Sequence, residues 1–185
     1  DRVIVSTDGD EIAKISRESG AEIIDRPAEL AQDNTSMFEV LKSEVFKIDP
    51  IPEFVVLLQP TTPFRKSVHL KMAISVFVEN RERYDSLIAC ERVPEKWHPS
   101  QVIVSTPLGL RMANGVPISN RFTNSQGFPE AWVPTGSLYI FKTENLKKGS
   151  LYGGRVMAYE SEGSVNINNL ADWASAEEWL KKSKS

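Results

Sequence analysis

Two polar motifs hold side chains that could bind and orient a substrate or a cation. Gln59 follows the apolar run 54–58 and opens a loop with the sequence QPTTP. Its amide can both donate and accept hydrogen bonds, to a polar ligand or to the backbone of the loop. Asn166 and Asn168 stand two residues apart, on one face of an extended strand. Their carbonyl oxygens can ligate a hard cation but bring no negative charge.

Charged residues at the ends of predicted strands are weaker candidates. Arg65 precedes a predicted helix over 67–80, where it could pair with a phosphate or a carboxylate or remain solvated. Arg26 lies in a loop before a proline, where an arginine is usually solvated. Asp8 follows the first predicted strand, and we expect it to cap the next helix.

Composition excludes several classes of function. The net charge is −3, from 22 basic and 25 acidic residues, so we expect no nucleic-acid partner. Cys90 is the one cysteine and lies in an apolar run, which indicates a buried residue rather than a nucleophile. His69 and His98 are far apart without neighbouring ligands, so neither indicates a metal site; beside Trp97, His98 suits packing or a dimer contact. With no apolar stretch of about 20 residues and no signal peptide, we predict no membrane contact and a cytoplasmic protein.

Alternating strands and helices predict an α/β fold with a mostly parallel sheet. The run 54–58 is apolar without alternation, which predicts a strand covered on both faces. Ser36 and Glu39 have the spacing of a capping box at the start of a helix. Predicted strands cover 2–6, 21–24, 54–58, 85–90, 137–142 and 155–159, and predicted helices begin near 10, 37, 67, 143 and 170.

Residues 91–134 interrupt this alternation. The segment contains six prolines and short strand-like pieces such as 102–104. We interpret 91–134 as an inserted hairpin, a plausible dimer extension, within a single domain over 1–185.

Five stretches, taken in order, resemble one family. They are DRVIVSTD at 1–8, DRPAELA at 25–31, LLQPTTPFR at 57–65, GSLYI at 136–140 and SVNIN at 164–168. Their order and spacing are similar to those of the acylneuraminate cytidylyltransferases, the CMP-sialic acid synthetase family. The resemblance covers nearly all 185 residues.

This resemblance implies a fold and an activity. The fold would be Rossmann-like, of the nucleotide-diphospho-sugar transferase type, with helices on both faces of the sheet. The enzyme would be a homodimer that joins CTP to an acidic nine-carbon sugar, giving the CMP-sugar and pyrophosphate with the help of Mg²⁺. Family members begin with a phosphate-binding strand and loop. Nothing in this sequence matches that loop, so we expect an N-terminally truncated domain with weak or no binding of CTP.

The resemblance also implies roles for particular residues. Gln59 would contact the sugar and, with Asn168, serve catalysis, while Asn166 and Asn168 would stand at the metal-binding positions. Arg26 would lie near the cytosine. The other implied substrate-binding residues are Thr35, Met37, Arg65, Ser125, Thr135, Tyr139, Leu151 and Tyr152.

Several of these positions depart from the family pattern. The family has Asp-x-Asp where this chain has Asn166 and Asn168. Ser125 replaces an arginine, and Thr135 replaces the asparagine before Gly136. Fewer basic groups are consistent with a related acidic sugar other than N-acetylneuraminate, or with a neutral sugar, and the lost carboxylates predict weaker Mg²⁺ binding.

Two other interpretations stay open. The chain could be a non-catalytic homologue that binds sugar or nucleotide, with residues 166–169 forming a polar turn that caps the last helix. A dinucleotide-binding oxidoreductase would share the sheet, but the sequence has no Gly-x-Gly-x-x-Gly motif, which argues against it.

Overall fold

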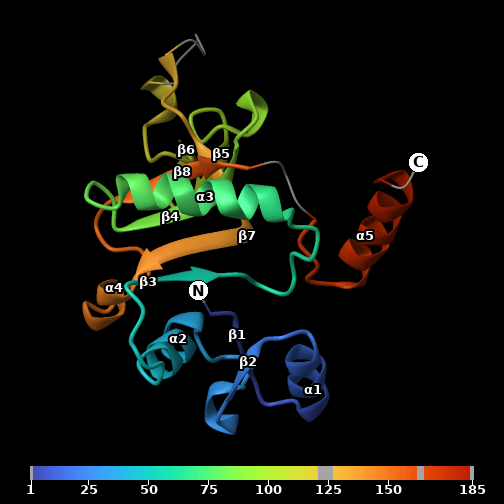
Figure 1. The fold of residues 1–185 in the computed structure, drawn as a ribbon. Coiled ribbons are helices and arrows are strands. Elements are labelled where there is room, and N and C mark those ends of the chain that lie inside the picture. The colour runs from blue at the N-terminus through green and yellow to red at the C-terminus, as the bar shows by residue number, and fades with distance from the viewer. Residues whose placement is uncertain (1, 121–126, 162–164, 184–185) are drawn as a thin grey trace. The chain divides into compact units, whose positions relative to one another are not determined.

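A computed structural model describes residues 2–120, 127–161 and 165–183 (Figure 1). The chain divides into two compact units. The first unit comprises Asp1–Val55, Arg81–Ser86 and Ile140–Val156, and the second comprises Val56–Asn80, Leu87–Tyr139 and Met157–Ser185. Strands and helices alternate along the chain as the sequence predicted, in an α/β arrangement.

The first unit opens with a parallel pair of strands joined by a helix. Strands β1 (Ile4–Thr7) and β2 (Glu22–Asp25) pair in parallel, and α1 (Asp10–Glu18) connects them. The prediction that Asp8 caps this helix is wrong. The N-cap residue is Gly9, whose N–H donates to Thr7 Oγ1 at 3.1 Å.

Helix α1 leaves its two isoleucines exposed. Ile12 and Ile15 recur at helical spacing, yet their exposed fractions are 56% and 55%, and within the helix only Ala13 is buried. The periodicity of apolar residues shows on which face of a helix their side chains gather. Whether another element covers that face depends on tertiary packing with segments distant in the sequence.

Helix α2 (Met37–Val45) begins as its sequence predicts. The Ser36 hydroxyl accepts from the Glu39 N–H at 3.2 Å, and the Glu39 carboxylate accepts from the Ser36 N–H at 3.1 Å. This capping box satisfies two N–H groups that the first turn leaves without partners. A short 3₁₀ turn, Ala28–Leu30, precedes α2. Helix α4 (Thr143–Lys147) packs against α2.

A four-stranded sheet has the order β3-β7-β4-β8. Its strands are β3 (Phe54–Leu57), β7 (Trp132–Lys142), β4 (Ser86–Arg92) and β8 (Val156–Glu160). Backbone hydrogen bonds from Val93 to Ala131 and from Thr143 to Glu53 show that β7 runs antiparallel to both neighbours. Bonds from Asp85 to Arg155 and from Ser161 to Cys90 show that β4 and β8 are parallel. The sheet is therefore mixed, with three strands in one direction.

Strand β3, predicted from the sequence to be covered on both faces, is covered only in part. It forms an edge of the four-stranded sheet among the described residues, and each of its four residues, which alternate between the two faces, is half-buried. The buried strands are instead β4 and β7, with Leu87 and Ile140 fully buried and Cys90 close to it. Burial of Cys90 raises the pKa of its thiol, as expected for a packing residue.

Helix α3 (Ser67–Asn80) lies across one face of the sheet (Figure 1) and buries Ala73 and Phe77 completely. The last helix is α5 (Leu170–Ser183), in which Trp179 stacks on Phe64 with ring centroids 4.5 Å apart. No helix in the described ranges is long and apolar enough to cross a membrane.

The segment 91–134 contains a small antiparallel hairpin. Strands β5 (Ile103–Thr106) and β6 (Gly109–Met112) pair there, flanked by the 3₁₀ turns Glu95–Trp97 and Ile118–Asn120. His98 is buried, stacks on Phe128 with centroids 4.8 Å apart, and bonds through Nε2 to the Pro129 carbonyl at 2.9 Å. His98 therefore packs this segment. Its part in a dimer stays a prediction.

Candidate active site

The loop after β3 is held in place by its own backbone and by Arg65. The Thr62 N–H donates to the Gln59 carbonyl at 3.2 Å. The Arg65 guanidinium donates to the main-chain carbonyls of Gln59 and Ser137, which joins the loop to β7. Partial burial lowers the pKa of Arg65, because the charged form loses solvation. In this arrangement Arg65 fixes two backbone segments.

Gly136 in β7 is the point where two predicted site residues meet. Its φ is +73°, a conformation that side chains with a Cβ rarely adopt. A Cβ at this position would lie 3.1 Å from Asn166 Nδ2 and 3.5 Å from Gln59 Oε1. Both amides therefore pack against the glycine. We call Gln59, Gly136 and Asn166 the amide cradle.

Hydrogen bonds hold the segment around Asn166 to the Gln59 loop. The Ile167 N–H donates to the Thr61 carbonyl at 2.7 Å, and the Thr62 hydroxyl donates to the Gly136 carbonyl at 3.3 Å. Asn166 Oδ1 is buried and has no hydrogen-bond partner among the described residues. A buried acceptor without a partner costs free energy, so this oxygen is suited to a ligand that donates a hydrogen bond.

The polar turn predicted at 166–169 exists, but its residues have separate roles. Asn169 Oδ1 accepts from the N–H groups of Ala171 and Asp172 at 2.9 and 3.0 Å and so caps α5. The Asn168 N–H donates to the Asp172 carboxylate at 2.9 Å, while the residue itself is exposed. Asn166 takes no part in the cap and belongs to the cradle.

The residues around the cradle do not fit a Mg²⁺ site by themselves. Asn166 offers one neutral oxygen, and the described residues contain no group of three or more His, Cys, Asp or Glu side chains that could hold a metal ion. Mg²⁺ prefers octahedral oxygen coordination and is usually held by one or two carboxylates with substrate phosphates. These residues alone therefore do not supply a metal ion for the reaction.

Other predicted residues on β7 lie beside the cradle. The Thr135 hydroxyl is 3.1 Å from the Ala89 carbonyl and 2.7 Å from the Ser137 hydroxyl, and both hydroxyl residues are buried. Tyr139 is half-buried further along the strand. The Thr135 hydroxyl is thus engaged with the Ala89 carbonyl and the Ser137 hydroxyl inside the sheet. Ser125 lies outside the described residues.

The predicted cytosine-binding residues belong to the first unit. The Arg26 guanidinium donates to the Ser6 hydroxyl at 3.1 Å and to the Ser6 carbonyl at 2.7 Å, which ties the ends of β1 and β2. The Thr35 hydroxyl donates to the Glu29 carbonyl at 3.3 Å. Met37 opens α2 and is 39% exposed, so it is not a core residue.

Leu151 and Tyr152 also belong to the first unit, in the turn before β8. Their carbonyls accept from Asn145 Nδ2 at 3.1 Å and from the Ser86 hydroxyl at 2.6 Å. Leu151 is half-buried and Tyr152 is 38% exposed. The backbone of this turn is therefore fixed while the Tyr152 ring stays accessible.

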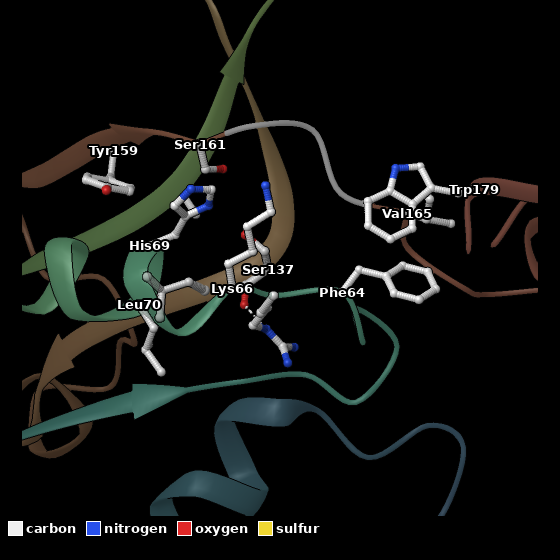
Figure 2. Close-up of a pocket in the computed structure, with 12 residues that line it drawn as sticks. Phe64, Lys66, His69, Leu70, Ser137, Tyr159, Ser161, Val165 and Trp179 are labelled. Atoms are coloured by element: carbon white, nitrogen blue, oxygen red, sulfur yellow. Dashed lines mark hydrogen bonds between the residues drawn. The ribbon is translucent and has the colours of Figure 1, made fainter. Parts of the chain in front are cut away.

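The structure adds a pocket that the sequence did not indicate. Its lining includes Lys66 and His69 at the start of α3, Tyr159 and Ser161 at the end of β8, and Trp179 of α5 (Figure 2). His69 was weighed only as a metal ligand, and no motif singled out Lys66. Lys66 lies immediately before α3 and His69 lies in its first turn, and this spacing of three residues was the available signal.

Alternating strands and helices, with polar loops after the strands, are typical of α/β folds that bind ligands at the carboxyl ends of their strands. One solved structure of similar fold is a CMP:2-keto-3-deoxy-manno-octonic acid synthetase in complex with CTP. The TM-score is 0.68 with 13% identity, and the match covers 99% of this chain and 82% of that one.

The family follows from the sequence comparisons. The cytidylyltransferase family profile matches residues 1–126, so this chain belongs to the cytidylyltransferase family. The N-acylneuraminate cytidylyltransferase of Escherichia coli O18:K1:H7 is 30% identical over 177 residues, which cover 94% of this chain. The enzyme of that name from Streptococcus agalactiae serotype V is 27% identical over 92% of this chain. The chain spans about 40% of the length of these relatives.

Proposed function

We propose that the protein containing this chain transfers CMP from CTP to an acidic sugar and releases pyrophosphate. The observation that carries the proposal is the amide cradle, where Gln59 and Asn166 meet at Gly136 beside the end of β3. Membership of the cytidylyltransferase family supports the nucleotide. The names of the sequence relatives support a sialic acid-like sugar.

The cradle suits the positioning of a sugar rather than acid–base chemistry. The Gln59 amide can donate to one sugar hydroxyl and accept from another. Asn166 Oδ1 can accept from a hydroxyl or an amide N–H of the ligand, which would satisfy that buried oxygen. The Arg65 bonds hold the loop rigid. In our proposal the anomeric hydroxyl then attacks the α-phosphorus in line and loses its proton to water, while a new O–P bond forms and the bond to pyrophosphate breaks.

We expect Mg²⁺ to arrive with the triphosphate, because the cradle supplies only neutral oxygens. We further propose that the enzyme is a homodimer in the cytoplasm, with 91–134 as the dimer extension.

Pyrophosphate release tests this function directly. The full-length protein is incubated with CTP, Mg²⁺ and a panel of eight- and nine-carbon sugar acids, beside an established N-acylneuraminate cytidylyltransferase. We expect release with at least one acid and little with the corresponding neutral sugars. If no acid supports release while the established enzyme is active, the proposed function is wrong.

A second candidate is a non-catalytic homologue that binds sugar or nucleotide. The observation that favours it is the amide pair Asn166 and Asn168 at positions where the resemblance implies carboxylates. Substantial turnover by the unmodified protein would exclude it. Binding of a sugar acid without turnover, followed by a gain of activity in the double aspartate variant, would support it.

A further inference from the structure

The peptide that joins Gly136 to Ser137 interrupts the regular conformation of β7. Extended strands have φ of about −120° to −140°, whereas Gly136 has φ +73°. Glycine has no Cβ and adopts positive and negative φ about equally readily, so the residue itself does not fix the orientation of this peptide. Other groups must therefore hold it.

Two buried threonines hold the two ends of this peptide. The Thr62 hydroxyl donates to the Gly136 carbonyl at 3.3 Å, and the Ser137 N–H donates to Thr135 Oγ1 at 3.4 Å. The exposed fraction of Thr62 is 0% and that of Thr135 is 9%. Both bonds therefore lie in the interior, where a hydrogen bond is electrostatically stronger than in water.

Each threonine is fixed in turn by another segment. The Thr62 N–H donates to the Gln59 carbonyl at 3.2 Å, so Thr62 is tied to the loop that carries the first cradle amide. The Thr135 hydroxyl donates to the Ala89 carbonyl of β4 at 3.1 Å and lies 2.7 Å from Ser137 Oγ. The peptide is thus connected to the Gln59 loop on one side and to β4 on the other.

The backbone at Gly136 decides how the two cradle amides are placed. A Cβ on Gly136 would lie 3.1 Å from Asn166 Nδ2 and 3.5 Å from Gln59 Oε1, so both amides pack closely on this glycine. A rotation of the Gly136–Ser137 peptide would move the surface against which they pack. Misplacement of a positioning group by about 1 Å can cost on the order of 100-fold in rate.

We propose that Thr62 and Thr135 are positioning residues for the transfer reaction. Their hydroxyls hold the Gly136–Ser137 peptide and thereby set the geometry of the amide cradle that orients the sugar. The inference rests on the proposed function, because it names residues that act on the sugar through the cradle of that same site. All the residues involved belong to the second unit.

Thr62→Val and Thr62→Ser separate the hydroxyl from the shape of the side chain, because only serine keeps the hydrogen-bonding group. The full-length protein is assayed with CTP, Mg²⁺ and the most active sugar acid of the panel. In Thr62→Val, kcat/KM for the sugar acid should fall by about 10- to 100-fold, mostly through a higher KM for the sugar. The KM for CTP should change by less than about twofold. Thr62→Ser should restore most of the loss.

Thr135→Val removes the hydroxyl at the other end of the peptide and should also raise the KM for the sugar acid. Because both threonines hold one peptide, the double variant should lose less than the product of the two single losses. A merely smaller folded fraction would lower kcat and leave KM unchanged, so the KM for the sugar separates positioning from a structural role. If Thr62→Val does not fold, Thr135→Val and Thr62→Ser decide.

Thr143→Val is the matched control. Thr143 is also buried, with an exposed fraction of 4%, and its Oγ1 has no hydrogen-bond partner among the described residues. This change should leave both KM values and kcat as in the wild type. An unchanged KM for the sugar in the folded Thr62 and Thr135 valine variants, or an equal rise in Thr143→Val, would overturn the inference. Thermal unfolding shows which variants are folded.

A measurement without substrate keeps this inference separable from the proposed function. The side-chain amide signals of Gln59 and Asn166 are followed by NMR in the isotope-labelled full-length protein, and each is assigned by its loss in the corresponding alanine variant. Thr62→Val should shift both signals and Thr143→Val neither. If these shifts occur and no sugar acid supports transfer, the positioning role stands and the function is wrong. If transfer proceeds and neither the signals nor the KM for the sugar change, the function stands and this inference is wrong.

Discussion

The side-chain amides of Gln59 and Asn166 meet at Gly136, although 107 positions separate them in the sequence. A glycine with φ +73° makes this approach geometrically feasible, since a Cβ would lie 3.1 Å from Asn166 Nδ2. The hydrogen bond from Ile167 to Thr61 holds the two segments in register. This contact brings Gln59 and Asn166, two predicted site residues, together at one glycine.

Removing the Gln59 side chain should reduce activity without unfolding the protein. Arg65 binds the main-chain carbonyl of Gln59, so Gln59→Ala keeps that bond. Losing an amide that orients the sugar should lower kcat/KM by about 10- to 100-fold, or about 1.4–2.7 kcal/mol. Steady-state kinetics measure this effect. Gln32→Ala, at an exposed position of the first unit, is the control and should match the wild type.

Gly136→Ala should impair activity more than it impairs stability. The new Cβ would press on Asn166 Nδ2 and approach Gln59 Oε1, and the positive φ adds a backbone cost of about 1 kcal/mol. Gly149→Ala is the matched control, because its φ is +82° and nothing lies within 4 Å of its added Cβ. Both variants should lose stability in urea unfolding because of the positive φ, and Gly136→Ala should lose somewhat more because of the close contact with Asn166. Equal activity in both would show that the cradle is not used.

Arg65→Lys should destabilise the protein although the charge remains. A lysine ammonium cannot reproduce the planar guanidinium that reaches two carbonyls, those of Gln59 and Ser137. We expect the free energy of unfolding to fall by about 1–3 kcal/mol. Urea denaturation measures it, with Arg17→Lys on the exposed face of α1 as the control. A change below about 0.5 kcal/mol would mean that these bonds contribute little.

Asp85 predicts a pH dependence of stability. Its carboxylate accepts from the Arg155 guanidinium at 3.3 Å and from the N–H groups of Gly154 and Arg155 at 3.1 and 2.9 Å. These bonds, that of the Arg155 side chain first, hold the pKa of Asp85 below its ordinary value. A lowered folded-state pKa stabilises the protein above the unfolded pKa of about 4 and loses that contribution as pH falls below it.

Comparing the wild type with Asp85→Asn isolates this contribution. The wild type should be more stable by about 1–2 kcal/mol at pH 7, and the difference should shrink below about pH 4. Urea unfolding across pH 7 to 3 measures it. Glu82→Gln removes a carboxylate that is 92% exposed and should show no such difference. A pH-independent gap for Asp85→Asn would contradict the assignment.

The combined change Asn166→Asp, Asn168→Asp discriminates between an active enzyme and a non-catalytic homologue. Two carboxylates would supply the negative charge that the amides lack and should lower the Mg²⁺ concentration needed for half-maximal activity. A protein that already turns over should change less than tenfold in kcat. A rise from no measurable turnover would favour the non-catalytic interpretation. Assays of pyrophosphate release over a Mg²⁺ series measure both quantities.

Sequence by itself determined much of this protein. Periodicity and capping patterns located the strands and helices, because these signals act within a few residues; Ser36 and Glu39 form the predicted capping box. Ordered motifs identified the family. Local patterns also placed Gln59 at a strand end and made Asn169 part of a cap.

Only the tertiary structure decided which residues meet and which faces are covered. It made β3 an edge strand, left Ile12 and Ile15 exposed, and gave the cap of α1 to Gly9 instead of Asp8. It also joined Lys66 and His69 to hydroxyls from β7 and β8. The physical reason is that strand order, burial and pocket lining depend on contacts between segments far apart in the chain, which a local pattern does not encode.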